Sequence, residues 1–179
     1  MTVALDADAA RDVADAHHAA SRRGGPECDA AYARLVDETD RLYRLLPVEI
    51  VFTMSEHPYD SADELIHSVR RDRILEVTSA AWERDRPHPV MGCEVGGEYD
   101  RFRAVHDVLG YGHLGVGFDR DGEYATWRFQ EQFHTPLARR ALATELHAEH
   151  SVRWTTGEHP EHKAVLLDER VVARSRAGG

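Results

Sequence analysis

The sequence predicts an α+β fold that is mostly α-helical, in which a helical bundle-like core carries a metal site beside a small sheet of two or three strands. Hydrophobic residues recur at helical spacing in most of the chain, as in helices that pack on a common core. Three short runs are β-branched and apolar enough for strands, at residues 48–54, 74–77 and 152–155. With 179 residues, 42% of them hydrophobic, a single domain over residues 1–179 is expected.

The first half of the chain carries three helix signals around two of these strands. Residues 1–25 are Ala-rich and charged, which predicts an N-terminal helix that can be mobile at its start. A second helix is predicted over Asp29–Leu46. Ser61 with Glu64 three residues later forms a capping box, which predicts a third helix running to about Arg71.

The second half is dominated by Asp100–His150, which places five of the twelve histidines in three helix-like segments. The second and third segments open at Asp121 and Pro136, and proline is well placed in a first helical turn. A last helix is predicted over Glu161–Arg174, followed by a disordered tail at residues 175–179.

Composition limits the classes of partner and compartment. The formal net charge of -10 argues against binding of a nucleic-acid polymer, which normally requires clustered Lys and Arg. No apolar run reaches the length of a membrane-spanning helix, so no membrane partner is expected. The acidic N-terminus does not resemble a secretory signal, and Cys28 and Cys93 do not form a disulfide framework. A cytoplasmic location is therefore expected.

The first helix-like segment presents a histidine on its apolar face. At about 100° per residue, Phe102, His106, Leu109 and His113 share one side. His106 is then either a hydrogen-bonded core residue or a metal ligand, because neutral imidazole binds a metal through one nitrogen while the other is oriented by a neighbour. Asp107 is expected to be that orienting group or a ligand itself.

The second and third segments each present an inward glutamate. Glu123 falls on the same face as Trp127, Gln130 and His134, where an ionised carboxylate is costly unless it is paired. Glu131 instead lies at the edge of the face, where a solvent-facing salt bridge to Arg128 is expected.

Glu145 lies on a face of small residues, where helices approach closely. His147 and His150 point elsewhere on the helical wheel and are expected at the surface.

Together these side chains predict a metal site held by His106, His113, Glu123 and Glu145. Two histidines with carboxylates and open positions suit Fe(II), and one ion is expected rather than two, although zinc or manganese would also fit. The alternative is a buried polar network without metal, in which arginines pair with the glutamates. The arginines considered for that network are Arg101, Arg103 and Arg140.

The segments FRAVHDVLGYGHLGVGF, DGEYATW, TPLARRALATE and PEHKAVLLDE resemble a largely uncharacterised family found in bacteriophages and actinobacteria. Its pattern is F-R-A-x-H-D-x-x-G-H, then G-E-x-x-A-W-x-x-H, then A-x-x-x-E-x-x-G-Q, then E-Q-K-x-x-L-L-P. The resemblance covers about residues 57–170, and His106, Asp107, Glu123 and Glu145 match its polar positions. Small proteins of actinomycete antibiotic pathways are also similar, among them a non-heme iron oxygenase that acts on a pyridine-type C-nucleoside.

The chain departs from this pattern at three polar positions. Tyr111 and Gln130 stand where the family has histidine, and Glu149 replaces a glutamine. Histidine occurs instead at His113 and His134, one or two helical steps away, so the site is expected to be rearranged.

The resemblance implies a non-heme iron-dependent oxygenase that acts on a small, nucleoside-like heterocyclic metabolite in antibiotic biosynthesis, with O₂ as co-substrate. Asp107, Tyr111 and Arg103 are then expected to act in catalysis. The expected substrate-binding residues are Arg101, Trp127, Gln130 and His134. A homodimer is compatible with the sequence.

Two other functions are kept open. His106-Asp107 is similar to the paired ligands of HD-type metal-dependent hydrolases, with His88 as an upstream partner. Alternatively, the protein is a non-catalytic, phage-derived accessory or binding protein in which the same residues form a structural polar or metal site.

Overall fold

The computed structural model describes residues 5–83 and 85–177. Its helices and strands follow in the order α1 (Ala7–Ala19), α2 (Pro26–Tyr43), β1 (Glu49–Thr53), α3 (Ala62–His67), β2 (Ile74–Thr78), α4 (Glu98–Asp107), α5 (Arg120–Gln130), α6 (Pro136–Leu142), α7 (Glu149–Thr156) and α8 (Glu169–Ala177). The described residues are therefore mostly helical with two strands, which confirms the predicted fold class.

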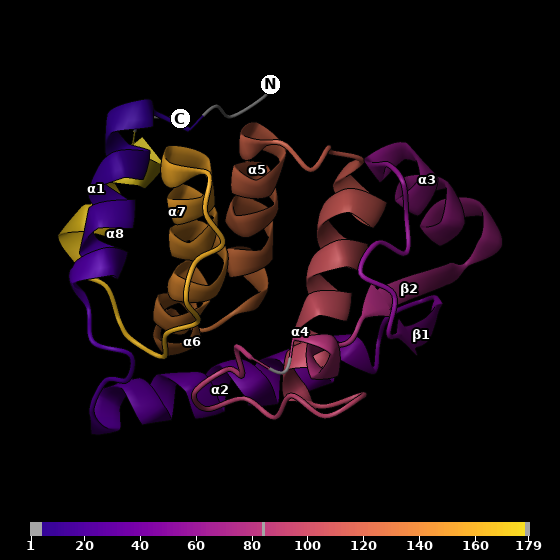
Figure 1. Cartoon of the computed structure of the whole chain (residues 1–179), viewed down its shortest axis with the longest axis horizontal. Coiled ribbons are helices and arrows are strands. Elements are labelled where there is room, and N and C mark those ends of the chain that lie inside the picture. The colour runs from indigo at the N-terminus through magenta and orange to yellow at the C-terminus, as the bar shows by residue number, and fades with distance from the viewer. Residues whose placement is uncertain (1–4, 84, 178–179) are drawn as a thin grey trace.

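The helices form a bundle with one helix laid across its end. In Figure 1, α2 passes beneath the others and packs against α4 and α6, while α1 packs against α7 and α8. The main core includes Tyr32, Leu35, Trp127 and Leu142, all at most 2% exposed. These large buried side chains hold α2, α5 and α6 together.

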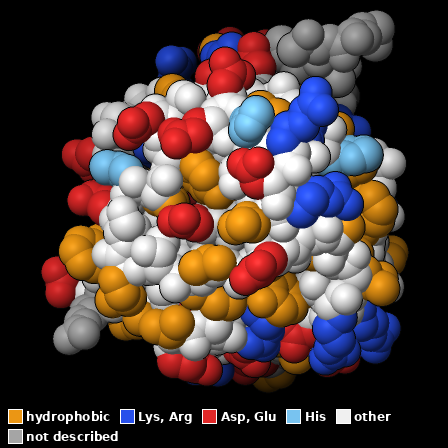
Figure 2. Space-filling model, turned by 90° about the vertical axis from the view of Figure 1, so that its right-hand side faces the viewer, with side chains coloured by type: hydrophobic (Ala, Val, Ile, Leu, Met, Phe, Trp, Pro, Cys, Tyr) orange, Lys and Arg blue, Asp and Glu red, His pale blue; other side chains and the backbone are white. Residues whose placement is uncertain are grey.

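The sheet lies on the other side of α4. β1 and β2 are parallel, with Glu49 opposite Ile74, and α3 belongs to the connection between them. Leu75 and Val77 of β2 bury their side chains against Ala104 of α4, whereas Val51 of β1 is 40% exposed. The face formed by α3 and the strands accordingly shows hydrophobic side chains interspersed with charged ones (Figure 2).

The capping prediction at α3 is confirmed in part. The Ser61 hydroxyl accepts a hydrogen bond from the Glu64 N–H, which makes Ser61 the N-cap. The Glu64 carboxylate bonds back to the N–H of Asp60 rather than to that of Ser61.

Residues 152–155 do not form the predicted third strand. They lie in α7, where the hydroxyls of Thr155 and Thr156 donate to carbonyls one turn earlier, and Gly157 ends the helix at φ +76°. A run of four residues is too short to show whether β-branched side chains belong to a strand or to the end of a helix.

The predictions for the two termini need correction. The last helix begins at Glu169 instead of Glu161, because the segment before it runs extended and pairs with the chain at Arg22–Gly24. It continues to Ala177, so residues 175–177 belong to the helix and not to a disordered tail. Residues 1–4 of the predicted N-terminal helix and residues 178–179 lie outside the described residues.

Three helices contain segments with π-helical i→i+5 hydrogen bonding. These are η1 (Ser68–Asp72), which continues α3, η3 (Val108–Leu114), which continues α4, and η5 (Ala143–Ala148), which joins α6 to α7. A π turn inserts an extra residue into the helical repeat and therefore rotates all following side chains relative to an α-helical wheel.

No helix among the described residues is both long and apolar enough to cross a lipid bilayer.

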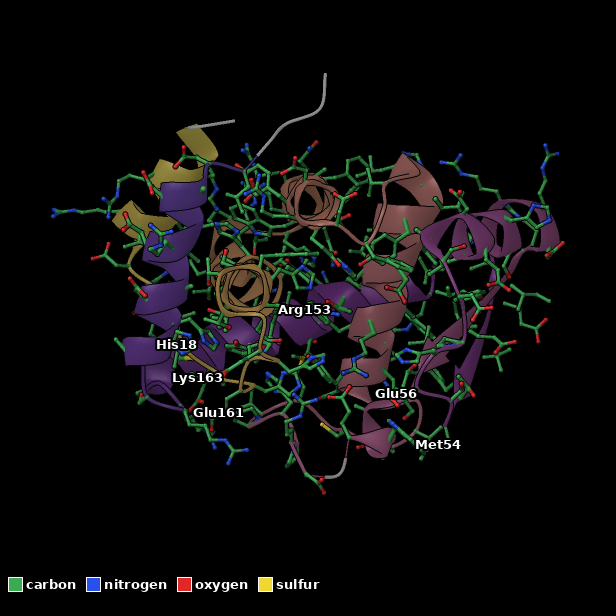
Figure 3. The ribbon with its side chains drawn as sticks, turned by 45° about the horizontal axis from the view of Figure 1, so that its top comes forward. His18, Met54, Glu56, Arg153, Glu161 and Lys163 are labelled. Carbon is green, nitrogen blue, oxygen red and sulfur yellow. The ribbon has the colours of Figure 1, made fainter. Side chains whose placement is uncertain are left out.

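Lys163 closes the C-terminal end of α1. Its buried ammonium donates to the carbonyls of His17 (2.8 Å), His18 (3.2 Å) and Ala20 (2.8 Å), and Figure 3 shows it beside His18. We expect Lys163→Met to lower the free energy of unfolding by about 2 kcal/mol, because methionine keeps the apolar stem but removes all three hydrogen bonds to the helix end. Urea unfolding measures this, and a variant as stable as the wild type would contradict it.

His17 is buried beside this ammonium, and neither ring nitrogen has a hydrogen-bond partner among the described residues. Burial, with the Lys163 charge, lowers the pKa of His17 from 6.5 to about 4. The folded state thus favours neutral imidazole. This contribution to stability is fully present above pH 6.5 and is lost as the pH falls towards 4.

We expect His17→Phe to remove this part of the pH dependence. Between pH 7 and pH 4 the wild type should lose about 3 kcal/mol more than the variant, since one pKa unit corresponds to about 1.4 kcal/mol. Unfolding at several pH values tests the difference. Parallel stability curves for the two proteins would show that His17 does not titrate as described.

Candidate functional site

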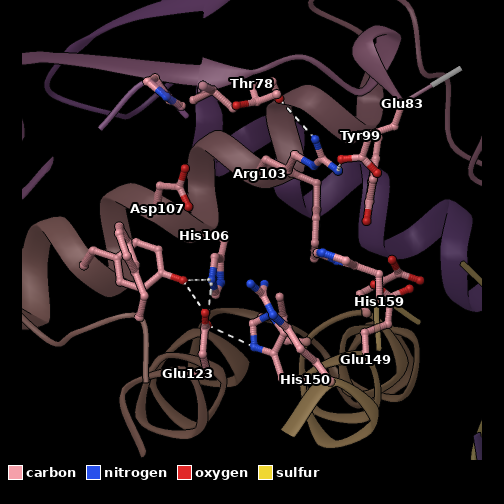
Figure 4. A pocket seen from close by; sticks show the side chains of 18 of the residues that line it. Thr78, Glu83, Tyr99, Arg103, His106, Asp107, Glu123, Glu149, His150 and His159 are labelled. Carbon is pink, nitrogen blue, oxygen red and sulfur yellow. Dashed lines mark hydrogen bonds and ion pairs between the residues drawn. The ribbon is translucent and has the colours of Figure 1, made fainter. Parts of the chain in front are cut away.

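A pocket of about 380 Å³ opens between α4, α5, α7 and the loops that face them. Figure 4 shows that imidazoles and carboxylates line it from several elements. Its titratable and charged lining residues are Glu56, His57, Glu76, Glu83, Arg86, Arg103, His106, Asp107, Glu123, Glu145, Glu149, His150, Arg153, His159 and His162, together with the phenols of Tyr59, Tyr99 and Tyr111.

Two histidines converge on one oxygen of Glu123. His106 Nε2, from α4, lies 3.3 Å from Glu123 Oε2, and His150 Nδ1, from α7, lies 3.0 Å from the same atom (Figure 4). The Tyr111 hydroxyl donates to the other oxygen, Glu123 Oε1, at 2.6 Å. We call His106, Glu123 and His150 the Glu123 cluster.

The positions of Glu123 and Tyr111 are set by the local backbone structure. Asp119 is the N-cap of α5 and accepts a hydrogen bond from the Gly122 N–H, so Glu123 sits in the first turn of that helix. A carboxylate is stabilised there by the helix dipole. Tyr111 lies in η3, whose π turn brings the phenol back towards His106, with its oxygen 3.3 Å from His106 Nε2.

Electrostatics favour a charged state in the Glu123 cluster. Burial alone would raise the pKa of Glu123, but the imidazoles of His150 and His106 outweigh it and lower that pKa well below the usual range. Burial likewise would lower the pKa of His106, but the neighbouring Glu123 carboxylate raises it. Burial, with the Glu123 charge, raises the pKa of Asp107 to about 6.

The donor set of the Glu123 cluster fits a first-row metal ion. Glu123 Oε2 and His150 Nδ1 are buried and lie 3.0 Å apart, yet neither atom has a hydrogen-bond partner among the described residues. Two nitrogens and one carboxylate oxygen are the ligands that Fe(II), Zn(II) and Mn(II) share. Among the described residues, no three His, Cys, Asp or Glu side chains are already gathered around one point as a metal-holding group. Binding of an ion would therefore require these side chains to rotate.

A second group of buried acids lies in the same pocket. Glu145 accepts bonds from Tyr32 Oη (2.5 Å) and His88 Nε2 (3.1 Å), and Glu149 lies 2.9 Å from His162 Nδ1. Burial raises the pKa of Glu149. For His162, the bond to Glu149 and the other nearby carboxylates overcome burial and raise the pKa to about 10.

Six of the eleven sequence-predicted site residues line this pocket. His106, Asp107, Tyr111 and Glu123 line one part of the pocket, and Arg103 and Glu145 line other parts. Arg103 donates to Glu83 and to the Thr78 carbonyl, and its guanidinium stacks over Tyr99. Among the described residues, no hydrogen bond joins Asp107 to His106.

The other five predicted site residues do not line this pocket. His113 stacks on Phe129 on the outer side of α5, with ring centroids 5.1 Å apart, because η3 rotates it away from His106. Arg101 binds Asp40, and His134 binds Glu38. Trp127 and Gln130 are fully buried in the bundle.

Sequence reasoning missed His150 and misjudged His147. Both were expected at the surface, but His150 joins the Glu123 cluster and His147 is 3% exposed, stacked on Trp127. His147 lies within the π segment η5 and His150 follows it, so the directions of both side chains differ from those on an α-helical wheel. Glu131 forms the expected salt bridge to Arg128 but is buried, because Arg176 of α8 covers it.

His88 and His162 belong to loops, which have no periodicity that could have placed them.

In comparisons with known proteins, no family model, no curated protein and no solved structure matches the chain.

Proposed function

We propose that this protein is a non-heme iron-dependent oxygenase that acts on a small heterocyclic metabolite. The observation that carries the proposal is the Glu123 cluster, in which two histidines from separate helices face one carboxylate oxygen in a pocket wall. Two histidines and one carboxylate with open positions are the ligand set of many iron oxygenases. Bound Fe(II) would supply the redox chemistry with O₂.

The pocket suits a small organic substrate. Its volume of about 380 Å³ is at the lower end of the range for metabolite and drug-sized ligands. Tyr99, Phe102 and Phe118 line it with aromatic surface, against which a flat heterocycle can pack. Arg153 also lines the pocket, one turn after His150 in α7, where it can meet an anionic group of the substrate.

The chain's own residues would orient the metal ligands. The Tyr111 O–H holds Glu123 Oε1 and so leaves Oε2 turned to the imidazoles. Such orienting partners typically contribute 10–100-fold to metal affinity or activity. His113, which the sequence predicted as a ligand, does not belong to the Glu123 cluster. His150 is the second histidine of the proposed ligand set instead.

The experiment compares two histidine variants in protein loaded anaerobically with Fe(II). We expect His150→Ala to weaken iron binding at least tenfold, while His113→Ala, outside the pocket, keeps wild-type affinity. Bound iron is measured directly, and O₂ uptake is followed with pyridine- and nucleoside-type compounds. Full iron retention by His150→Ala would contradict the ligand set, and stoichiometric iron without O₂ uptake would contradict the oxygenase.

A hydrolase of HD type is the second candidate, since Asp107 lines the pocket next to His106. The hydrolase hypothesis predicts that the protein hydrolyses a phosphoester with a divalent metal in the complete absence of O₂. The oxygenase hypothesis predicts no turnover without O₂. A stable protein that binds no metal would instead favour the non-catalytic alternative.

A further inference from the structure

A second pocket, of about 430 Å³, lies between α6 and α8. It shares no lining residue with the pocket of the Glu123 cluster. Its volume is within the range of sites for small organic ligands. Its wall combines an apolar part, formed by Pro136, Ala143, Leu167, Val172 and Ala173, with a charged part, formed by Glu131, Arg139, Arg140, Glu169 and Arg176.

Arg139 lines this pocket and has no carboxylate partner among the described residues. Its Nε donates to the carbonyls of Glu131 (2.6 Å) and His134 (2.7 Å), while its terminal amino groups make no hydrogen bond within the described part of the chain. The two carbonyls orient the guanidinium without neutralising its charge. Since Nε carries only one of the N–H donors of an arginine, the others remain for a ligand.

Glu131, the buried acid of this pocket, is already bound by two other arginines. Arg176 donates to Glu131 Oε2 through Nε (3.2 Å) and Nη2 (2.9 Å). Arg128 donates to Glu131 Oε1 through its Nε at 3.0 Å. One carboxylate therefore faces two guanidinium groups, and it does not compensate the charge of Arg139.

Arg140 has two acidic partners, but both lie at the surface. It donates to Glu27, and its Nε lies 3.1 Å from Glu169. The side chains of these glutamates are 70% and 73% exposed, so water screens their charges. Four arginines and three carboxylates take part in these contacts, which leaves a positive excess in a chain whose formal net charge is -10.

We propose that the pocket between α6 and α8 binds a small organic anion, whose carboxylate or phosphoryl oxygens accept hydrogen bonds from Arg139. A guanidinium can donate two parallel hydrogen bonds to either group. The apolar body of the ligand would pack against Leu167 and Val172 and lose its contact with water. This site goes beyond the proposed function, since it uses none of the residues of the Glu123 cluster.

The test titrates the full chain, without added iron, with benzoate and with phenyl phosphate by calorimetry. We expect at least one of them to bind saturably, and the tighter one identifies the anionic group. Benzyl alcohol, which has no charge, and acetate, which has no ring, should each bind at least tenfold more weakly. Equal affinity for either of these control ligands would overturn the proposal.

Two variants test the site itself. Arg139→Gln should weaken binding of the tighter anion at least tenfold, because an amide lacks the charge and the paired donors of a guanidinium. Arg174→Gln is the matched control, since Arg174 of α8 pairs with Asp12 outside the pocket. If Arg139→Gln fails to fold by circular dichroism, Ala173→Trp repeats the test. Ala173 is exposed, and a large side chain there would fill the pocket.

The outcomes are independent of the oxygenase proposal. Absence of saturable binding by the wild type overturns the anion site, as does unchanged affinity in a folded Arg139→Gln or Ala173→Trp variant. Binding that is lost in Arg153→Gln instead would place the anion in the pocket of the Glu123 cluster and also overturn it. None of these results affects iron binding or O₂ uptake, by which the oxygenase is tested.

Discussion

Replacing Glu123 with glutamine is expected to reduce iron-dependent O₂ uptake on the order of 1000-fold. Both histidines of the Glu123 cluster face Oε2 of this residue, and an amide offers neither the charge nor the second oxygen. Loss of an orienting neighbour alone typically costs 10–100-fold, so loss of the shared ligand should cost more. Bound iron and O₂ uptake should fall together.

A second Glu→Gln variant controls for the loss of a buried carboxylate. Glu131 is also buried, but it pairs with Arg128 and Arg176 away from this pocket. Glu131→Gln should lower stability and leave iron binding and O₂ uptake at wild-type levels. Equal losses of activity in the two variants would mean that Glu123 acts through the fold and not as a ligand.

Gly110→Ala is expected to destabilise the protein by roughly 3 kcal/mol. A Cβ at Gly110 would lie 2.3 Å from Thr126 Cγ2 and 2.6 Å from its Oγ1, both far inside van der Waals contact. Alanine has the better helix propensity by about 1 kcal/mol, but the clash outweighs it. Since Gly110 lies in η3 and Thr126 in α5, the variant should also separate His106 from Glu123.

Shortening the side chain of Thr126 should recover part of the stability lost in Gly110→Ala. In the double variant Gly110→Ala with Thr126→Ala, the two shortest contacts disappear and the contact to Cβ, at 3.0 Å, is what remains. Gly25→Ser is the matched control, because a Cβ there meets nothing within 4 Å. Thermal and urea unfolding of the wild type, Gly110→Ala, Thr126→Ala and the double variant test the coupling, which would be absent if Gly110→Ala acted only on backbone flexibility.

The sequence was sufficient for features that depend on local pattern. The β-branched run at residues 48–54 gave β1 within one residue at each end, and Ser61 was found as a cap because its signal is complete within four residues. The inward directions of His106 and Glu123 followed from regular α-helix in α4 and α5, and these two residues meet.

The directions of residues in π segments and the positions of loop residues could not be predicted from a regular helical repeat. η3 and η5 change the helical phase without a residue signature, and they account for the misplacement of His113, His147 and His150. His88 and His162 reach Glu145 and Glu149 from loops 57 and 13 residues away, and such contacts depend on the tertiary fold. Trp127 was correctly placed inward, yet the same face leads to the core and not to the pocket.

The segment that contains Lys163 connects the N-terminal helix α1 to the pocket. Lys163 donates hydrogen bonds to the last carbonyls of α1, while the imidazole of its neighbour His162 lines the pocket. Two adjacent residues of one extended segment thus anchor a helix on one side and hold a pocket residue on the other. Local unfolding of α1 would remove this anchor of the segment that carries His162, so the packing of the N-terminal helix and the position of a pocket residue depend on the same contacts.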